Sequence, residues 1–258
     1  MIPIRLAVTS CTLMTMVLLS ACTADTSKDA DGPSVAEQSS STTTPPPSEP
    51  TYTYHTPSSG ADVPGAPDLS RFGEEELEPG RYTFLPFGGS EADLPEMRVP
   101  DGFAAYKGFA AGARKGPFRS VMVWTIDTVD LQPCKTSGPT RIGPSPDALA
   151  EALSRQRLTT TTAPERIELG GHQGLYLEVT APTGRGFTDC DSFDLWANDG
   201  GGLRYLQGPG QVERLWILDV PGERLVIDAS STQGVTPSQE QQLRQMVESA
   251  RFRQPATP

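Results

Sequence analysis

The sequence has few of the residues on which much enzyme and nucleic-acid chemistry depends. It contains two histidines, four cysteines and four lysines among 258 residues. A Ser-His-Asp triad would have to use His172, because His55 lies in a stretch that we expect to be unfolded, and no Gly-x-Ser-x-Gly elbow is present. The net charge of −11 argues against nucleic acid as a partner, since phosphate binding depends on Lys and Arg.

The sequence also has no apolar run long enough to span a bilayer. The longest one covers residues 6–19, which at ~1.5 Å per residue makes a helix of ~21 Å, against a hydrocarbon core of ~30 Å. Arg5 precedes this run. A short apolar segment that follows a basic residue is typical of a secretory signal peptide. We expect residues 1–21 to be a signal peptide.

The end of this segment, Leu19-Ser20-Ala21-Cys22, resembles the lipobox of bacterial lipoproteins. The resemblance implies that cleavage occurs before Cys22 and that its thiol carries lipid. The protein would then be held at the extracytoplasmic face of the cell membrane. Two or more acyl chains would make this anchor stable, because each buried CH₂ contributes ~0.8 kcal/mol. The alternative is an ordinary secretory signal with a cysteine at this position by chance.

The remaining cysteines form an even pair. Cys11 leaves with the signal peptide and Cys22 would carry the lipid, so Cys134 and Cys190 remain. Disulfides form and persist in oxidising compartments outside the cytoplasm. We expect a Cys134–Cys190 disulfide, and the alternative is two buried free thiols.

Composition divides the rest of the chain into two parts. Residues 22–71 are rich in Ser, Thr, Pro, Gly and Asp and show no apolar periodicity. Such a segment cannot bury enough apolar surface to offset its chain entropy. We expect residues 22–71 to be a disordered tether and residues 72–258 to form one globular domain.

Local motifs predict two helices in this domain. Ser145 and Pro146 begin the first, which we expect to end near Arg157, and Thr236-Pro237-Ser238-Gln239 is a capping box for the second. Strands are expected between and before them. The candidates are Arg81–Leu85, Pro95–Val99, Phe103–Phe109, Ser120–Val129, Glu165–Leu169, Leu175–Thr180, Ser192–Ala197, Leu203–Leu206, Val212–Val220 and Glu223–Ala229. The last two are joined at Pro221-Gly222, which suits a type II turn. Because strands follow one another between the helices, the prediction is an α+β fold, an antiparallel sheet with two flanking helices.

Four segments of the domain form a pattern: Val99-Pro100-Asp101-Gly102-Phe103, Gly170-Gly171, the hairpin arm 222–227 and the final helix 241–252. The arrangement resembles the Mog1/PsbP-like sandwich, which includes LpqN-type actinobacterial lipoproteins. The resemblance implies an accessory or binding role outside the cytoplasm. The family shares no catalytic residues, so it implies no catalytic site and no cofactor.

Two groups of residues are candidates for ligand contacts. Asp189, Asp191 and Asp194 lie around Cys190, and oxygen-rich clusters of this kind can bind Ca²⁺, although a solvated acidic loop is the alternative. His172 is a candidate contact in a glycine-rich turn, or simply a polar turn residue. The three tryptophans, Trp124, Trp196 and Trp216, line either a pocket or the core. We expect no metal site.

These observations predict a non-enzymatic lipoprotein of the cell envelope. Its partners would be the membrane, through the lipid on Cys22, and an envelope protein, a glycan or an apolar ligand. The alternative is an envelope hydrolase that uses carboxylate chemistry, because the separation of paired carboxylates cannot be seen in a sequence.

Overall fold

The computed structural model describes residues 65–89, 94–134 and 138–253. Strands make up 41% of this part of the chain. Its three α-helices are short: α1 (Pro146–Ser154), α2 (Arg185–Thr188) and α3 (Pro237–Glu248). A 3₁₀ helix, η1 (Leu69–Phe72), comes first, and Leu69 is fully buried in the core. None of these described helices is both long and apolar enough to cross a bilayer.

One large antiparallel sheet is the centre of the structure. Its strand order is β3-β4-β5-β14-β13-β10-β8, and β9 also pairs with β10. The strands are β3 (Phe103–Tyr106), β4 (Ala110–Ala113), β5 (Arg119–Trp124), β8 (Thr160–Thr161), β9 (Glu165–Leu169), β10 (His172–Thr180), β13 (Val212–Val220) and β14 (Glu223–Ser231).

Two smaller antiparallel sheets accompany it. The first has the order β1-β2-β15, with β1 (Gly80–Thr83), β2 (Leu94–Val99) and β15 (Arg251–Arg253). The second has the order β12-β11-β6-β7, with β6 (Thr128–Val129), β7 (Thr140–Arg141), β11 (Asp194–Ala197) and β12 (Leu203–Tyr205).

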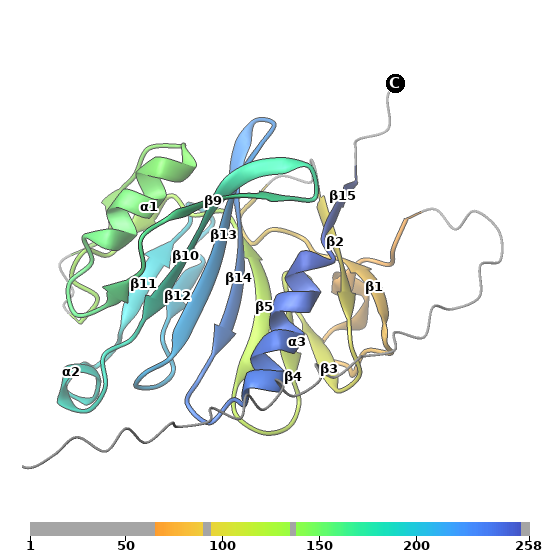
Figure 1. Ribbon diagram of the computed structural model, residues 1–258, viewed down its shortest axis with the longest axis horizontal. Coiled ribbons are helices and arrows are strands. Elements are labelled where there is room, and N and C mark those ends of the chain that lie inside the picture. Colours follow the sequence, from red (N-terminus) through yellow and green to blue (C-terminus); the bar gives the residue numbers. More distant parts are fainter. Residues whose placement is uncertain (1–64, 90–93, 135–137, 254–258) are drawn as a thin grey trace, which may run out of the picture. The chain divides into compact units, whose positions relative to one another are not determined.

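Each face of the large sheet is covered by one of the small sheets and one helix. Side chains alternate along each strand, so Val121 and Val123 of β5 point to one face and Met122 and Trp124 to the other. On the first face the core includes apolar residues of α3, which lies over β5 and β14, and of the β1-β2-β15 sheet (Figure 1). On the second face it includes apolar residues of α1 and of the β12-β11-β6-β7 sheet.

The expected fold, a single antiparallel sheet with two flanking helices in a Mog1/PsbP-like sandwich, is therefore wrong. The described chain is mostly β-structure, with three antiparallel sheets and three short helices. The strands that form the additional sheets are mostly two to four residues long. A strand this short shows no clear apolar alternation, and no local pattern tells which sheet a strand will join.

Predictions based on caps and turns are confirmed. The Ser145 side chain accepts a hydrogen bond from the backbone of Ala148 and begins α1, which ends at Ser154 rather than near Arg157. Thr236 and Gln239 form the capping box of α3. Strands β13 and β14 pair along their whole length across the Pro-Gly turn, where Gly222 has a φ of +87°. A Gly in this turn accommodates the positive φ that other residues avoid.

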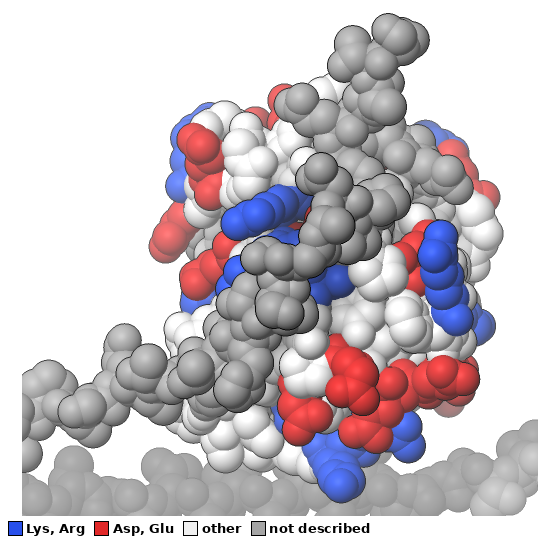
Figure 2. Space-filling model, turned by 90° about the vertical axis from the view of Figure 1, so that its right-hand side faces the viewer, with Lys and Arg blue, Asp and Glu red and all other residues white. Residues whose placement is uncertain are grey.

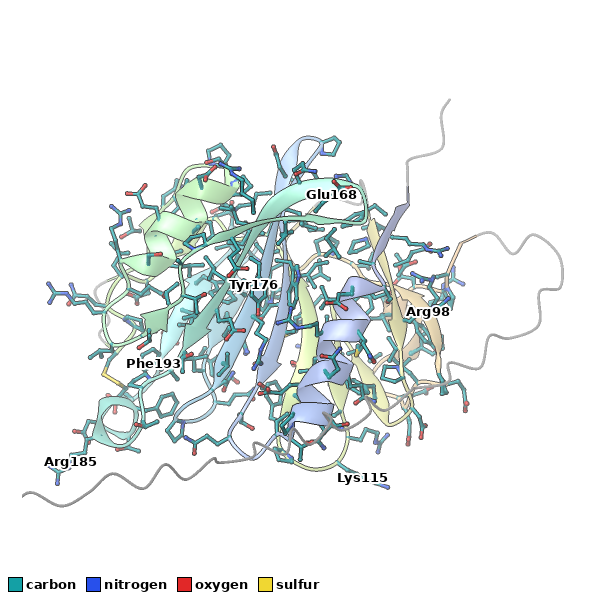
Figure 3. All side chains as sticks on the ribbon, viewed as in Figure 1. Arg98, Lys115, Glu168, Tyr176, Arg185 and Phe193 are labelled. Carbon is teal, nitrogen blue, oxygen red and sulfur yellow. A yellow bond between two sulfur atoms is a disulfide. The ribbon has the colours of Figure 1, made fainter. Side chains whose placement is uncertain are left out.

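The predicted disulfide is also confirmed. Cys134 and Cys190 are bonded, with their Cα atoms 5.0 Å apart. The bridge lies beside α2 (Figure 3) and joins the segment after β6 to the segment before β11. It therefore fixes the loop that contains α2 to the sheet that β11 and β6 share.

Replacing both cysteines, as Cys134→Ser with Cys190→Ser, is expected to lower the free energy of unfolding by about 2–4 kcal/mol. The bridge spans a sequence separation of 56 residues and so constrains the unfolded chain. Urea denaturation of the double variant and the oxidised wild type measures the difference. Equal midpoints and slopes would show that the bridge does not stabilise the fold.

Candidate functional site

A pocket of about 670 Å³ opens on the second face of the large sheet. Residues of β3, β4 and β5 form one side of it, and residues 201–207, which include β12, form the other. Since β12 is the end strand of the β12-β11-β6-β7 sheet, the pocket lies where this covering sheet stops. Its volume is within the range of sites for small ligands.

Aromatic side chains form much of the pocket lining. Phe87 stacks on Phe109 with ring centroids 4.6 Å apart, and Trp124 meets both rings edge-on. Tyr106 packs edge-on against Phe109 and is 43% exposed at the rim. Aromatic pairs in these geometries are stabilised beyond their burial. The pocket therefore has a firm apolar wall with an accessible aromatic edge.

Small residues make the pocket deep. Ala104 of β3 and Ala110 and Gly112 of β4 line it, where larger side chains would fill the space. A Cβ atom on Gly112 would meet only ordinary contacts, 3.8 Å from the Cβ of Ser120 and 3.9 Å from a backbone oxygen. The depression thus results from the size of the side chains on β3 and β4, and it can be filled by substitution.

Two buried polar groups at the pocket have no hydrogen-bond partner among the described residues. They are the hydroxyl oxygen of Ser120 and the indole nitrogen of Trp124. Buried polar groups in native proteins usually have a partner, and a ligand is one means of supplying it. Both atoms are almost inaccessible to solvent, so a ligand in the open pocket would reach them only if the lining moved.

A buried ionic cluster lies behind the pocket. Arg204 of β12 lines the pocket, and its guanidinium reaches the large sheet, where Nη2 donates to Glu213 of β13 at 2.7 Å. Glu213 also accepts hydrogen bonds from Gln211 at 2.6 Å and from the Ser230 hydroxyl at 2.9 Å. The Arg204 and Glu213 side chains are almost completely shielded from solvent. This cluster fastens the wall of the pocket to the large sheet.

A second carboxyl group, that of Asp228 on β14, completes the cluster. Its Oδ2 lies 3.4 Å from Nε of Arg204, and the residue is fully buried. Burial and the negative charge of Glu213 raise the pKa of Asp228 well above its usual value. Burial opposes ionisation of Glu213 as well, but Arg204 and the surrounding hydrogen bonds lower its pKa. Of the two carboxyl groups, Glu213 is therefore the one that pairs with Arg204 as a carboxylate, and Asp228 is the one that takes up a proton more readily.

The substitution Asp228→Asn is expected to change how stability depends on pH. A carboxyl group whose pKa is raised by folding stabilises the fold below its ordinary pKa of ~3.9, and this contribution is lost as the pH rises towards the folded value. Asn does not titrate. Relative to the wild type, the variant should therefore gain stability above about pH 4, by at most ~1.4 kcal/mol per pH unit.

Urea denaturation between pH 4 and pH 8 measures this difference. Asp219→Asn, at an exposed position of the same hairpin, is the control and should follow the wild-type profile. A constant difference between Asp228→Asn and the wild type would mean that Asp228 is ionised in the folded protein.

The acidic residues predicted as ligand contacts are spread along one loop. Asp191 lines a shallower depression of about 430 Å³, together with Cys190 and Phe193. Asp189 is exposed at the end of α2, and Asp194 accepts a hydrogen bond from the Ser192 hydroxyl. Within the described residues no cluster of His, Cys, Asp or Glu is arranged to hold a metal ion.

His172 does not join these residues. It begins β10, and the acidic loop follows the other end of this strand, so ~27 Å of extended chain separates them. Its ring packs edge-on against Phe252, with centroids 4.4 Å apart. The arrangement gives His172 a packing role at this end of the sheet.

The three tryptophans have different positions. Trp124 lines the pocket, and Trp196 lies behind it with its ring centroid 6.3 Å from that of Trp124. Trp216 is on the opposite face of the sheet, against Tyr176. All three tryptophans are buried in the core, and Trp124 also lines the pocket.

The outer surface differs from the pocket in its charge. The face shown in Figure 2 carries Lys and Arg beside Asp and Glu, with acidic side chains gathered in the lower part of the view. Among the residues that line the pocket, Lys107, Arg114 and Arg204 are basic and Glu74 is acidic. A protein with a net charge of −11 thus has a pocket where basic residues outnumber acidic ones.

Sequence reasoning did not find most of this site. Phe87 and Phe109 meet Trp124 through contacts between strands, which leave no local signal. A signal did exist for the ionic cluster, because Glu213 and Asp228 occupy inward positions of strands whose neighbours are apolar. Charged residues at such positions predict that both carboxyl groups are buried and that a residue of opposite charge is buried beside them.

No model of a known protein family matches this chain, and no curated protein matches it either.

Proposed function

We propose that this protein is a lipid-anchored binding protein of the cell envelope that holds an apolar or aromatic group of its ligand in the pocket beside β12. The anchor and compartment rest on the lipobox-like segment that ends at Cys22, which lies outside the described residues. The disulfide between Cys134 and Cys190 supports an oxidising compartment.

The pocket is the observation that carries the binding role. It is open to solvent, lined by aromatic and small side chains, and backed by an ionic cluster that holds its wall in place. A pre-formed apolar pocket with a few polar groups is the usual form of a ligand site. The ligand would bury an aromatic or aliphatic group against Phe109 and Trp124.

The geometry does not favour the hydrolase alternative. The carboxyl groups of Glu213 and Asp228 do lie together, but both residues are fully buried and neither lines the pocket. Glycoside hydrolysis needs two carboxyl groups on opposite sides of an accessible substrate bond. Glu213 instead forms a buried ion pair with Arg204.

Blocking lipidation by Cys22→Ala should release the protein from membranes. The folded domain would then have lost the acyl chains that hold it at the bilayer. Fractionation of cells that express the two forms measures the change, with a conservative substitution in the tether, Ser41→Ala, as the control. Retention of the Cys22→Ala form in the membrane fraction would contradict the anchor.

Filling the pocket by Gly112→Leu should weaken binding of indole at least tenfold. Indole is a probe of the size of one aromatic side chain, and a Leu at this position would project into the pocket from a Cβ that meets only ordinary contacts. Gly112→Ala, which adds one methyl group, is the matched control and should reduce affinity less. Titrations followed by NMR at the Met122 methyl and the Trp124 indole N–H give the dissociation constants.

Circular dichroism shows whether the variants keep the fold. Equal affinity in the wild type and in a folded Gly112→Leu variant would place indole elsewhere. Absence of any shift at Met122 and Trp124 in the wild type would contradict the binding role of the pocket.

A further inference from the structure

The geometry points to an extended polypeptide segment as the ligand, bound as a fifth strand along the open edge of β12. This inference rests on the proposed function and names the class of partner. The bound strand would extend the β12-β11-β6-β7 sheet over the uncovered part of β4 and β5. Its inward side chains would enter the pocket.

The outer edge of β12 pairs with no other strand of the described chain, although the Tyr205 C=O accepts a hydrogen bond from Nη1 of Arg204 at 3.1 Å. In the sheet order it pairs with β11 alone. Gly202 accepts a hydrogen bond from Asn198 at 3.0 Å, and the Leu206 N–H donates to Phe193 at 2.9 Å, so even-numbered positions bond towards β11. In an antiparallel strand the alternate residues direct their N–H groups to the other side. The N–H groups of Leu203 and Tyr205 therefore point away from β11.

This outer edge faces the pocket. Every residue from Gly201 to Tyr205 lines it, although Leu203 and Tyr205 are about half exposed and Arg204 is buried. Side chains of consecutive strand residues point to opposite sides, so these consecutive residues can all face the pocket only through their backbone edge. Edge strands with unpaired backbone groups are the sites at which proteins add a strand from a partner.

A strand added beside this edge would lie above small residues of the large sheet. A strand added to β12 would lie ~4.8 Å from it, and packed sheets are ~10 Å apart. The floor beneath that position is formed by small residues, Ala110 and Gly112, and by Ser120 and Met122. A large floor residue would prevent a strand from lying there. Alternate side chains of the ligand would fill the pocket between this floor and the aromatic residues.

A second, smaller depression lies beside the same stretch of chain. Tyr205 and Gln207 line both this depression and the pocket, and Phe187 and Asp191 line the second depression alone. Two depressions that share these residues fit an elongated ligand better than a compact one. This arrangement favours a polypeptide over a single aromatic molecule.

The charged residues that line the two depressions indicate where the ligand should carry a charge of opposite sign. Lys107 and Arg114 lie at the β3–β4 end with Glu74, and Asp191 lies at the other end. Arg114 is 3.8 Å from Glu76, a pair in which both side chains are about half exposed and which is therefore weak. The ligand segment should carry an acidic residue near Lys107 and apolar or aromatic residues at alternate positions.

The experiment is a selection of random 12-residue peptides displayed on phage against the Cys22→Ala chain, followed by affinity measurements with the synthetic peptides. Peptides with alternate apolar residues and an acidic end should be enriched. Leu203→Pro removes one outward N–H and leaves the bonds to β11 in place, since Pro is tolerated at strand edges. It should weaken peptide binding at least tenfold, whereas Leu203→Ala, which keeps the N–H, should weaken it less than threefold.

Indole separates this inference from the proposed function. If the wild type binds indole but no peptide is enriched, or if Leu203→Pro binds the peptides as well as Leu203→Ala does, the strand-addition inference is wrong and the pocket function stands. If neither indole nor any peptide binds, both fail. If Leu203→Pro does not fold, N-methylation of alternate peptide amides is the second test, and equal affinity of all methylated peptides would overturn the inference.

Discussion

The ion pair between Arg204 and Glu213 is the interaction on which the site depends. Arg204 is the inward residue of β12, and Glu213 belongs to the large sheet, so their contact fixes the end strand of one sheet against the face of another. Removing one partner of such a buried pair leaves an uncompensated charge, which costs about 3–5 kcal/mol. The need to keep the buried Arg204 charge paired therefore sets the position of β12, and with it the wall of the pocket.

The raised pKa of Asp228 follows from the same constraint. One guanidinium neutralises one carboxylate, and a third buried charge would have no partner in the described chain. Burial and the neighbouring Glu213 raise the pKa of Asp228 well above its usual value. Protonation of Asp228 would leave no net charge behind the pocket, which suits an apolar group in the ligand.

The sequence predicted those parts of the structure that short-range chemistry determines. The caps at Ser145 and Thr236, the turn at Gly222 and the Cys134–Cys190 bridge all follow from residues next to one another or from the count of cysteines. The division into three sheets does not. It depends on which distant strands pair, as when β15 joins β2 or β6 joins β11.

The pocket was out of reach of sequence reasoning for a related reason. It is a region that no element of the described residues covers, and it exists because β12 ends one sheet above small residues of another. Neither Ala110 nor Gly112 has a sequence signature of a site, and Phe87 reaches Trp124 only through the fold. When several strands and loops contribute the residues of a cavity, those residues share no pattern in the sequence.

The most direct test of this account is a measurement of nuclear Overhauser contacts between bound indole and the protein. The account predicts that protons of one indole molecule contact both Trp124 on β5 and Leu203 on β12, because the pocket lies between these two strands. Contacts to a surface that includes neither residue would contradict it.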